Sequence, residues 1–374
     1  MKKILVILST IFFFASSCED KKTDVPCSNC PDTELIDGPY NPQQYTFNLP
    51  SWLVQKPLLP ENDTMTIAGV ELGRYLFYDP ILSADNTLSC ASCHQQDKAF
   101  TDGSAVSVGI RGIPGTRSAM PIFNLAFNPR EFFWDGRVHT LETQALLPIT
   151  DPLEMDDTWE NVMERLRNDE DYPQLFRAAF GIKSKQEMTK ELAVNAIAQF
   201  ERSIVSFESR YDRILQFNEG WPTDEELRGQ TLFFIEPFMQ TDNHPGCSHC
   251  HNGPNFTNHT YSNNGLDKVD DLNDFVDRGR GAVTNNLFDN GKFKVPSLRN
   301  VALTPPYMHD GRFATLEEVI DNYALGGHGV INEDPNLVPF TLTEDDKRSL
   351  VAFLEMLTDT SFVNNPAYKN PFEE

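Results

Sequence analysis

The sequence predicts a mainly α-helical fold with two domains and extended loops. Apolar residues recur at helical spacing in several segments, some of them behind a capping-box pattern, whereas strand signals are weak. Twenty-five prolines and 21 glycines among 374 residues account for the loops. A five-residue motif with two cysteines and a histidine occurs twice, at 90–94 and at 247–251, so we expect one copy in each domain.

Both motifs have the pattern Cys-x-x-Cys-His. In c-type cytochromes the two thiols of this pattern form thioethers with one haem, and the adjacent histidine binds its iron. A single Cys-x-x-Cys beside a histidine also occurs in redox and zinc sites, but two copies favour haem. We therefore predict two cytochrome c-like haem domains. The residues expected to hold the two covalently bound haem c groups are Cys90, Cys93 and His94, and Cys247, Cys250 and His251.

Residues 1–18 are predicted to be a signal peptide. Two lysines precede an apolar run from Ile4 to Phe14 that is too short to span a bilayer. Cys18 follows small residues, as in a bacterial lipobox, so we expect a lipid anchor at Cys18; ordinary cleavage of an exported soluble protein is the alternative. The expected location is the periplasm or the outer membrane, with the lipid as the only membrane contact.

Residues 19–48 are predicted to be a linker, since prolines and charges alternate there. Cys27 and Cys30 lie in this segment without a following histidine. They fit a local disulfide in an oxidising compartment, or an inert thiol pair.

The formal net charge of −24 argues against nucleic acid as a partner, because nucleic-acid binding needs a basic footprint. An acidic surface favours a small basic redox protein through long-range attraction. Simple solubility is the other explanation of the charge.

The predicted domains cover 49–220 and 221–374, divided at the breaker sequence Gly-Trp-Pro that begins at Gly220. Segments 104–129 and 252–290 have no clear period and are expected to be loops. Apolar spacing and capping patterns predict helices over residues 69–77, 158–180, 185–217, 223–234, 315–323 and 343–357.

Four further sequence stretches lie between residues 49 and 358: Phe133 to Arg137, Gln144 to Met155, Val295 to Asn300 and Pro306 to Gly311. With the two Cys-x-x-Cys-His motifs they resemble the signatures of the bacterial di-haem cytochrome c peroxidase and MauG family. The resemblance implies a peroxidatic haem in domain 49–220, with His94 as its proximal ligand. It implies an electron-transfer haem in domain 221–374, with His251 as ligand.

The resemblance also implies roles for residues outside the motifs. Trp134 matches the tryptophan that lies between the two haems, although an ordinary core aromatic is the alternative. Glu154 matches the acid/base glutamate of the peroxide pocket, which Gln144 and Pro148 also line. A carboxylate suits this task because cleavage of peroxide moves a proton from one oxygen to the other. Without the resemblance Glu154 would be a solvated charge.

One departure from the better-known peroxidases concerns the first haem. Those enzymes place a histidine ligand in the loop after the first motif, where this chain has Ile110, and no histidine occurs between His94 and His139. Isoleucine cannot bind iron, so we predict that the sixth position is open at rest.

The second departure concerns the other haem. Tyr323 stands where the typical peroxidase has a methionine ligand, and MauG-type members have tyrosine there. A phenolate oxygen would favour ferric iron and lower the reduction potential relative to methionine. Met308 and His328 are nearby alternatives, and a ring that only packs on the porphyrin is another.

A calcium ion between the haems is usual in the family. Thr304 and Pro306 match positions that contribute backbone carbonyls, whereas Ser118 replaces the usual asparagine. Calcium favours several oxygen ligands and could still bind through water.

The resemblance predicts an exported enzyme that reduces hydrogen peroxide with electrons from a small c-type cytochrome or copper protein, and a homodimer is possible. A MauG-like enzyme that oxidises side chains of a partner protein is the alternative. A non-catalytic di-haem electron carrier is a third interpretation, against which Ile110 counts because a carrier needs both irons fully ligated.

Overall fold

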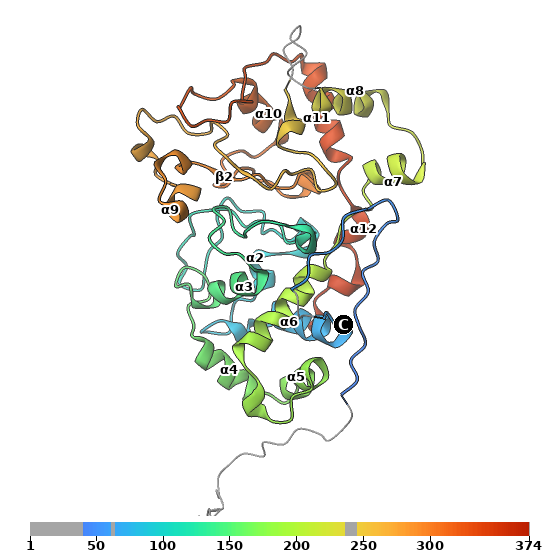
Figure 1. The fold of residues 1–374 in the computed structure, drawn as a ribbon, viewed down its shortest axis with the longest axis vertical. Coiled ribbons are helices and arrows are strands. Elements are labelled where there is room, and N and C mark those ends of the chain that lie inside the picture. Colours follow the sequence, from blue (N-terminus) through green and yellow to red (C-terminus); the bar gives the residue numbers. More distant parts are fainter. Residues whose placement is uncertain (1–39, 61–63, 236–244, 374) are drawn as a thin grey trace, which may run out of the picture. The chain divides into compact units, whose positions relative to one another are not determined.

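The computed structural model describes residues 40–60, 64–235 and 245–373. The predicted signal peptide, Cys18, Cys27 and Cys30 therefore lie outside the described residues. The described residues form one compact unit. The fold is mainly α-helical, as predicted, with helices of both halves of the chain joined by long loops (Figure 1). No helix in the described ranges has the length and apolar character needed to cross a membrane.

The first half of the chain contains the α-helices α1 Ile67–Tyr78, α2 Cys90–Cys93, α3 Leu141–Thr150, α4 Trp159–Asn168, α5 Tyr172–Phe180, α6 Lys190–Ser203 and α7 Arg210–Phe217. The second half contains α8 Asp224–Phe234, α9 Arg280–Thr284, α10 Leu316–Ala324, α11 Glu344–Glu355 and α12 Thr360–Val363. Two short strands, β1 Tyr261–Ser262 and β2 Phe293–Lys294, pair antiparallel, with Tyr261 opposite Lys294.

The first-half core is built on the crossing of α1 and α6. Thr66 caps α1 by accepting a hydrogen bond from the Gly69 N–H, and Asp79, which precedes a proline, ends it. The predicted helix 69–77 is thus confirmed. Gly73 faces α6 so closely that a Cβ there would lie 1.9 Å from the Ala196 carbonyl oxygen. The absence of a side chain lets the two backbones meet.

Replacing Gly73 with alanine is expected to destabilise the fold by about 1–3 kcal/mol, the usual cost of overpacking a well-filled core. The obstacle is backbone, so no side-chain rotation relieves it. The free energy of unfolding from denaturant titration gives the measurement. Gly115→Ala is the control, since its Cβ would meet only the Ser107 carbonyl oxygen, at 3.5 Å. Equal losses in both variants would contradict the close approach.

The prediction of one helix over 185–217 is wrong. The chain forms the 3-10 helix η4 Lys185–Glu187, then α6, an extended stretch and α7. Ser184 bonds the Glu187 carboxylate rather than a backbone N–H, and Thr189 is the residue that caps α6. After Ser203 the backbone leaves the helix because Asn124 takes over its hydrogen bonds: the Asn124 N–H donates to Ile204 O and its Oδ1 accepts from the Ser206 N–H.

The predicted helix over 158–180 is interrupted once. It divides into α4 and α5 at Asp169, whose Oδ1 accepts hydrogen bonds from the N–H groups of Asp171 and Tyr172. This local bonding by an aspartate competes with helix continuation. The aromatic anchors Trp159, Tyr172 and Phe176 are buried as expected.

The second-half core is formed mainly where α8 packs against α11, with α10 beside them. The capping box of Thr223 and Glu226 opens α8 as predicted. Thr315 and Thr343 cap α10 and α11 in the same way, each with an acidic residue at the third helical position. The predicted helices 223–234, 315–323 and 343–357 are therefore confirmed within a few residues at their ends.

The C-terminal segment returns to the first half of the chain. Phe362 packs in one cluster with Phe77 and Phe100, and the Tyr78 hydroxyl donates to the Tyr368 carbonyl at 2.6 Å. Figure 1 shows α12 and the C-terminus beside α6. The domain boundary at Gly220 stays a prediction.

Candidate functional site

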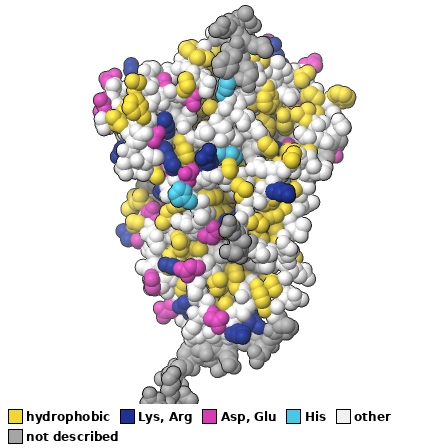
Figure 2. Space-filling model, viewed as in Figure 1, with side chains coloured by type: hydrophobic (Ala, Val, Ile, Leu, Met, Phe, Trp, Pro, Cys, Tyr) yellow, Lys and Arg dark blue, Asp and Glu magenta, His cyan; other side chains and the backbone are white. Residues whose placement is uncertain are grey.

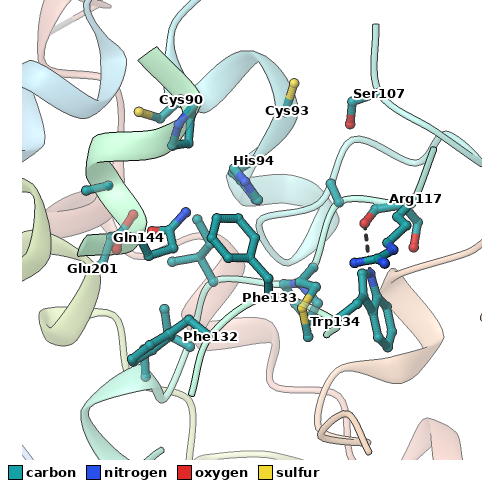
Figure 3. Close-up of a pocket in the computed structure, with 18 of the residues that line it drawn as sticks. Cys90, Cys93, His94, Ser107, Arg117, Phe132, Phe133, Trp134, Gln144 and Glu201 are labelled. Carbon is teal, nitrogen blue, oxygen red and sulfur yellow. Dashed lines mark hydrogen bonds between the residues drawn. The ribbon is translucent and has the colours of Figure 1, made fainter. Parts of the chain in front are cut away.

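A cavity in the first half contains the residues predicted to surround the peroxidatic haem (Figure 3). Its walls are mostly apolar and come from the loops on either side of α2, from α3 and α6, and from residues 255–259 and 294–297 of the second half. The site residues that the structure brings together in this cavity are Cys90, Cys93, His94, Trp134, Gln144 and Glu154.

Helix α2 carries the first Cys-x-x-Cys-His motif to the cavity. The Ser89 N–H donates to Ser92 Oγ at 3.0 Å and fixes the start of the helix. His94 follows its last turn, and His94 Nδ1 lies 2.9 Å from the Phe100 carbonyl oxygen, which leaves Nε2 as the nitrogen available to an iron. Burial lowers the pKa of His94, so the ring is neutral at physiological pH, the form that binds metal.

The second motif has the same bonding on a different local structure. Its first residues form the 3-10 helix η5 Cys247–His249, which follows Gly246 at φ +59°. His251 Nδ1 lies 3.2 Å from the Phe256 carbonyl oxygen, and burial lowers the pKa of His251 to about 4. In both motifs Nδ1 of the neutral imidazole is held by a backbone carbonyl, so Nε2 is the nitrogen that would bind iron.

The four motif cysteines fit attachment of haem better than a metal–thiolate site. They are free thiols of intermediate exposure, although Cys90 and Cys247 also touch core residues. Burial raises the pKa of all four thiols, to about 12 at Cys247 and about 11 at Cys250, so they stay protonated. Within the described residues no group of three or more His, Cys, Asp or Glu side chains could hold a metal ion. Cys90 and Cys93 are partly exposed thiols in the wall of the mostly apolar cavity, which is what a covalently attached porphyrin requires.

Glu154 lies in the same cavity wall as Gln144 and Pro148, which α3 contributes. The Glu154 N–H donates to the Asp151 carbonyl in the turn that follows α3. Burial raises the pKa of Glu154, the negative charge of Asp151 raises it further, and Arg137 opposes them. The cavity thus contains a carboxyl group that can exchange a proton nearer to neutral pH than an exposed glutamate can.

Ile110 does not line the cavity, but its backbone is bonded to Glu154, which does. The Ile110 N–H donates to the Glu154 carbonyl at 2.9 Å. Gly109 allows the approach, because a Cβ there would lie 2.0 Å from the Leu153 carbonyl oxygen. Val108 and Gly109 line the cavity on this side. That the sixth coordination position of the first haem iron is open stays a prediction.

Trp134 is buried and joins the two halves of the chain. Its Nε1–H donates to the Ser118 carbonyl at 3.0 Å, and its own carbonyl accepts from the Lys294 N–H in strand β2. Arg117, which lies beside it in Figure 3, forms ion pairs with Asp135 and Asp277. The indole therefore has a fixed orientation at the junction of first-half and second-half loops.

Tyr323 lies on α10 close to the second motif. Burial raises the pKa of Tyr323 to about 12; the hydrogen bond from Asn264 opposes this rise, and Cys250 and Cys247 add to it. The Tyr323 hydroxyl accepts a hydrogen bond from Asn264 at 3.3 Å. Of the alternative ligands, Met308 contacts the same Asn264, whereas His328 is exposed.

The residues predicted to bind calcium follow the 3-10 helix η8 Val301–Leu303. Thr304 ends this helix, and Pro306 is in the cis peptide Pro305–Pro306. Ser118, which replaces the expected asparagine, uses its hydroxyl to bond the Met308 carbonyl at 3.0 Å. The calcium site stays a prediction.

Sequence reasoning missed Glu201. This residue of α6 is 3 % exposed and lines the cavity near Gln144, as Figure 3 shows. Its Oε2 has no hydrogen-bond partner among the described residues. Burial raises the pKa of Glu201 to about 8, against the opposing charge of Arg202. The sequence feature that could have identified Glu201 as a site residue is its position as a carboxylate in the buried stripe of an apolar helix.

The fold and the two motifs define a class of protein: a mainly helical c-type di-haem protein with a carboxylate beside one haem cavity. The family model described as di-haem cytochrome c peroxidase matches residues 67–220. The chain is 37% identical over 298 residues to the methylamine utilization protein MauG of Methylorubrum extorquens, covering 80% of each chain. The chain belongs to the di-haem cytochrome c peroxidase and MauG family.

Two further relatives agree. The chain is 35% identical to the cytochrome c551 peroxidase of Nitrosomonas europaea, over 84% of this chain and 85% of the relative. Its fold is similar to the crystal structure of a MauG-like protein associated with microbial copper homeostasis, with a TM-score of 0.79 and 36% identity over 88% of this chain and 99% of that chain. Haem c is the cofactor that this family implies.

Proposed function

We propose that the protein is an exported peroxidase that reduces hydrogen peroxide to water with electrons from a small redox protein. The observation that carries the proposal is the cavity that is lined by the His94 imidazole, the attachment cysteines and the half-buried Glu154 carboxyl. A carrier of electrons needs no proton-exchanging group there, whereas peroxide cleavage does.

Cys90, Cys93 and His94 would hold haem c, which would supply the redox chemistry of peroxide reduction. Glu154 would take a proton from one peroxide oxygen and return it to the other, which leaves as water. Its raised pKa suits both halves of this transfer. Gln144 and Pro148 narrow the pocket around the reacting oxygens.

Electrons reach the first cavity from the second half of the chain. We assign His251 and Tyr323 as the ligands of the second haem, attached at Cys247 and Cys250. We assign Trp134 as a polarisable ring on the route between the two sites, since it lines the first cavity and is held by Ser118 and strand β2. Since a fixed orientation costs no reorganisation during transfer, this position suits a relay.

The electron donor is proposed to be a small c-type cytochrome or copper protein. The described surface around α9 exposes Val276, Leu287 and Phe288, with Asp271 and Asp274 nearby in the sequence. Figure 2 shows hydrophobic, acidic and basic side chains together in this upper-left region. The net charge of −24 favours a basic partner through long-range attraction.

Steady-state kinetics decide between the proposal and its alternative. Purified di-haem protein should consume hydrogen peroxide in proportion to the oxidation of reduced cytochrome c. A MauG-like enzyme, for which the MauG relative and Tyr323 are the supporting observations, would consume peroxide only with a partner protein whose side chains become oxidised. A carrier would show neither reaction and a low-spin ferric spectrum at both haems.

Two finer points belong to the same proposal. The predicted signal sequence supports export and a lipid on Cys18, and mass spectrometry of the mature N-terminus distinguishes the lipid from ordinary cleavage. Calcium bound through the carbonyl oxygens of Thr304 and Pro306 is tested by metal analysis of the purified protein. A homodimer is tested by light scattering.

A further inference from the structure

Asn264 holds both candidate ligands of the second haem with one amide group. Its Nδ2 lies 3.3 Å from the Tyr323 hydroxyl oxygen and 3.5 Å from the Met308 sulfur. An amide nitrogen carries two hydrogens, so it can donate to both atoms at once. The oxygen and the sulfur are therefore fixed as neighbours.

The loop that carries Asn264 is itself anchored. The preceding Asn263 is buried, and its Oδ1 accepts from the Gly265 N–H while its Nδ2 donates to Asn332 Oδ1 at 2.9 Å. The Asn263 carbonyl accepts from the Asp334 N–H. Because the neighbouring residues Asn263 and Gly265 are hydrogen-bonded, the Asn264 amide has little freedom to move away from Tyr323 and Met308.

Met308 is held from its other end in an unfavourable conformation. Its φ of +75° lies in the left-handed region, which a long side chain rarely adopts. The Ser118 hydroxyl donates to the Met308 carbonyl at 3.0 Å, and the Ser118 N–H donates to the next carbonyl, that of His309, at 2.8 Å. A strained residue over-determined by hydrogen bonds is typical of functional sites.

We propose that Asn264 is the positioning residue that selects the axial ligand of the second haem, presenting the Tyr323 oxygen and retaining the Met308 sulfur. The inference rests on the proposed function only in taking Tyr323 as the oxygen ligand. A thioether ligand raises the potential of a c-type haem, whereas an oxygen ligand that donates more charge favours ferric iron. The choice made by Asn264 therefore sets the potential at which the second haem releases electrons.

The test uses the purified di-haem protein and Asn264→Leu. We expect the ferric spectrum of the second haem to lose its oxygen-ligand signature and gain a low-spin thioether signature, with a more positive reduction potential in redox titration. Asn264→Asp keeps the side-chain shape but removes both N–H donors, so it should shift the spectrum in the same direction as Asn264→Leu. This variant tests the proposal if the leucine variant does not fold.

Two matched variants assign the effect. The double variant Asn264→Leu with Met308→Leu should lack the thioether signature, and its persistence would overturn the proposal, as would an Asn264 variant with the parental spectrum and potential. Tyr323→Phe should remove the oxygen-ligand signature from the second haem. A parental spectrum in the Tyr323→Phe variant would also overturn the proposal that Asn264 selects the ligand. Peroxide turnover at the first haem can continue in that variant, so this outcome is distinct from failure of the peroxidase proposal.

Discussion

Replacing Glu154 with glutamine is expected to lower kcat/KM for hydrogen peroxide by about 10²–10⁴-fold, the range by which a positioned acid–base group accelerates proton transfer. Glutamine keeps the shape of the side chain and its place in the cavity wall, but it cannot accept and return a proton. Peroxide still enters the cavity, and its cleavage loses the proton shuttle. Stopped-flow mixing with peroxide measures the rate directly.

The controls separate chemistry from assembly. The Glu154→Gln protein should contain both haems by pyridine haemochrome assay, since the substitution leaves Cys90, Cys93 and His94 in place. Glu160→Gln, an exposed change on α4, should leave the rate unchanged. A parental rate in Glu154→Gln would remove this residue from the mechanism.

The pH profile supplies a second measurement. Glu154 must be ionised to take the first proton, so the rate should rise with pH through the pKa of Glu154. Burial and Asp151 raise this pKa, which places the rise above the range of an ordinary glutamate. Asp151→Asn removes one of the two causes and should move the rise to lower pH.

The parts of the site that the sequence predicted are those fixed by local pattern. The Cys-x-x-Cys-His motifs carry their chemistry in adjacent residues, so Cys90, Cys93 and His94 could be assigned without a fold. A capping box located α8 for the same reason, because Thr223 and Glu226 close the first turn locally. The apolar face of residues 343–357 located α11.

The parts that failed depend on partners distant in sequence. Apolar spacing continues through residues 204–208 and predicted an unbroken helix, yet Asn124 and Asp359 draw that backbone into an extended path; Asp359 Oδ2 accepts from the Ser206 hydroxyl and the Glu208 N–H. The significance of Asn264 likewise appears only when Tyr323 and Met308 meet in space. No local pattern reports such contacts.

Glu201 gives the second large expected effect, a dependence of stability on pH. Its pKa rises from 4.5 to about 8 in the folded protein because burial disfavours the charge. Between pH 4.5 and 8 the unfolded chain releases this proton while the folded protein keeps it. The contribution of Glu201 to the free energy of unfolding is therefore complete below pH 4.5 and is lost as pH rises through 8. The loss over this pH window is roughly 5 kcal/mol.

Glu201→Gln should remove that loss, since a neutral amide fits the same buried position at every pH. The difference in unfolding free energy between the variant and the parent should move in favour of the variant from pH 5 to pH 9, as measured by guanidinium titration of the haem-loaded proteins. Glu164→Gln, an exposed change on α4, should follow the parent at each pH. A difference in unfolding free energy that stays constant across the pH series would mean that Glu201 ionises normally inside the fold. The cavity wall beside Gln144 would then be more polar than the buried, unpartnered Oε2 of Glu201 indicates.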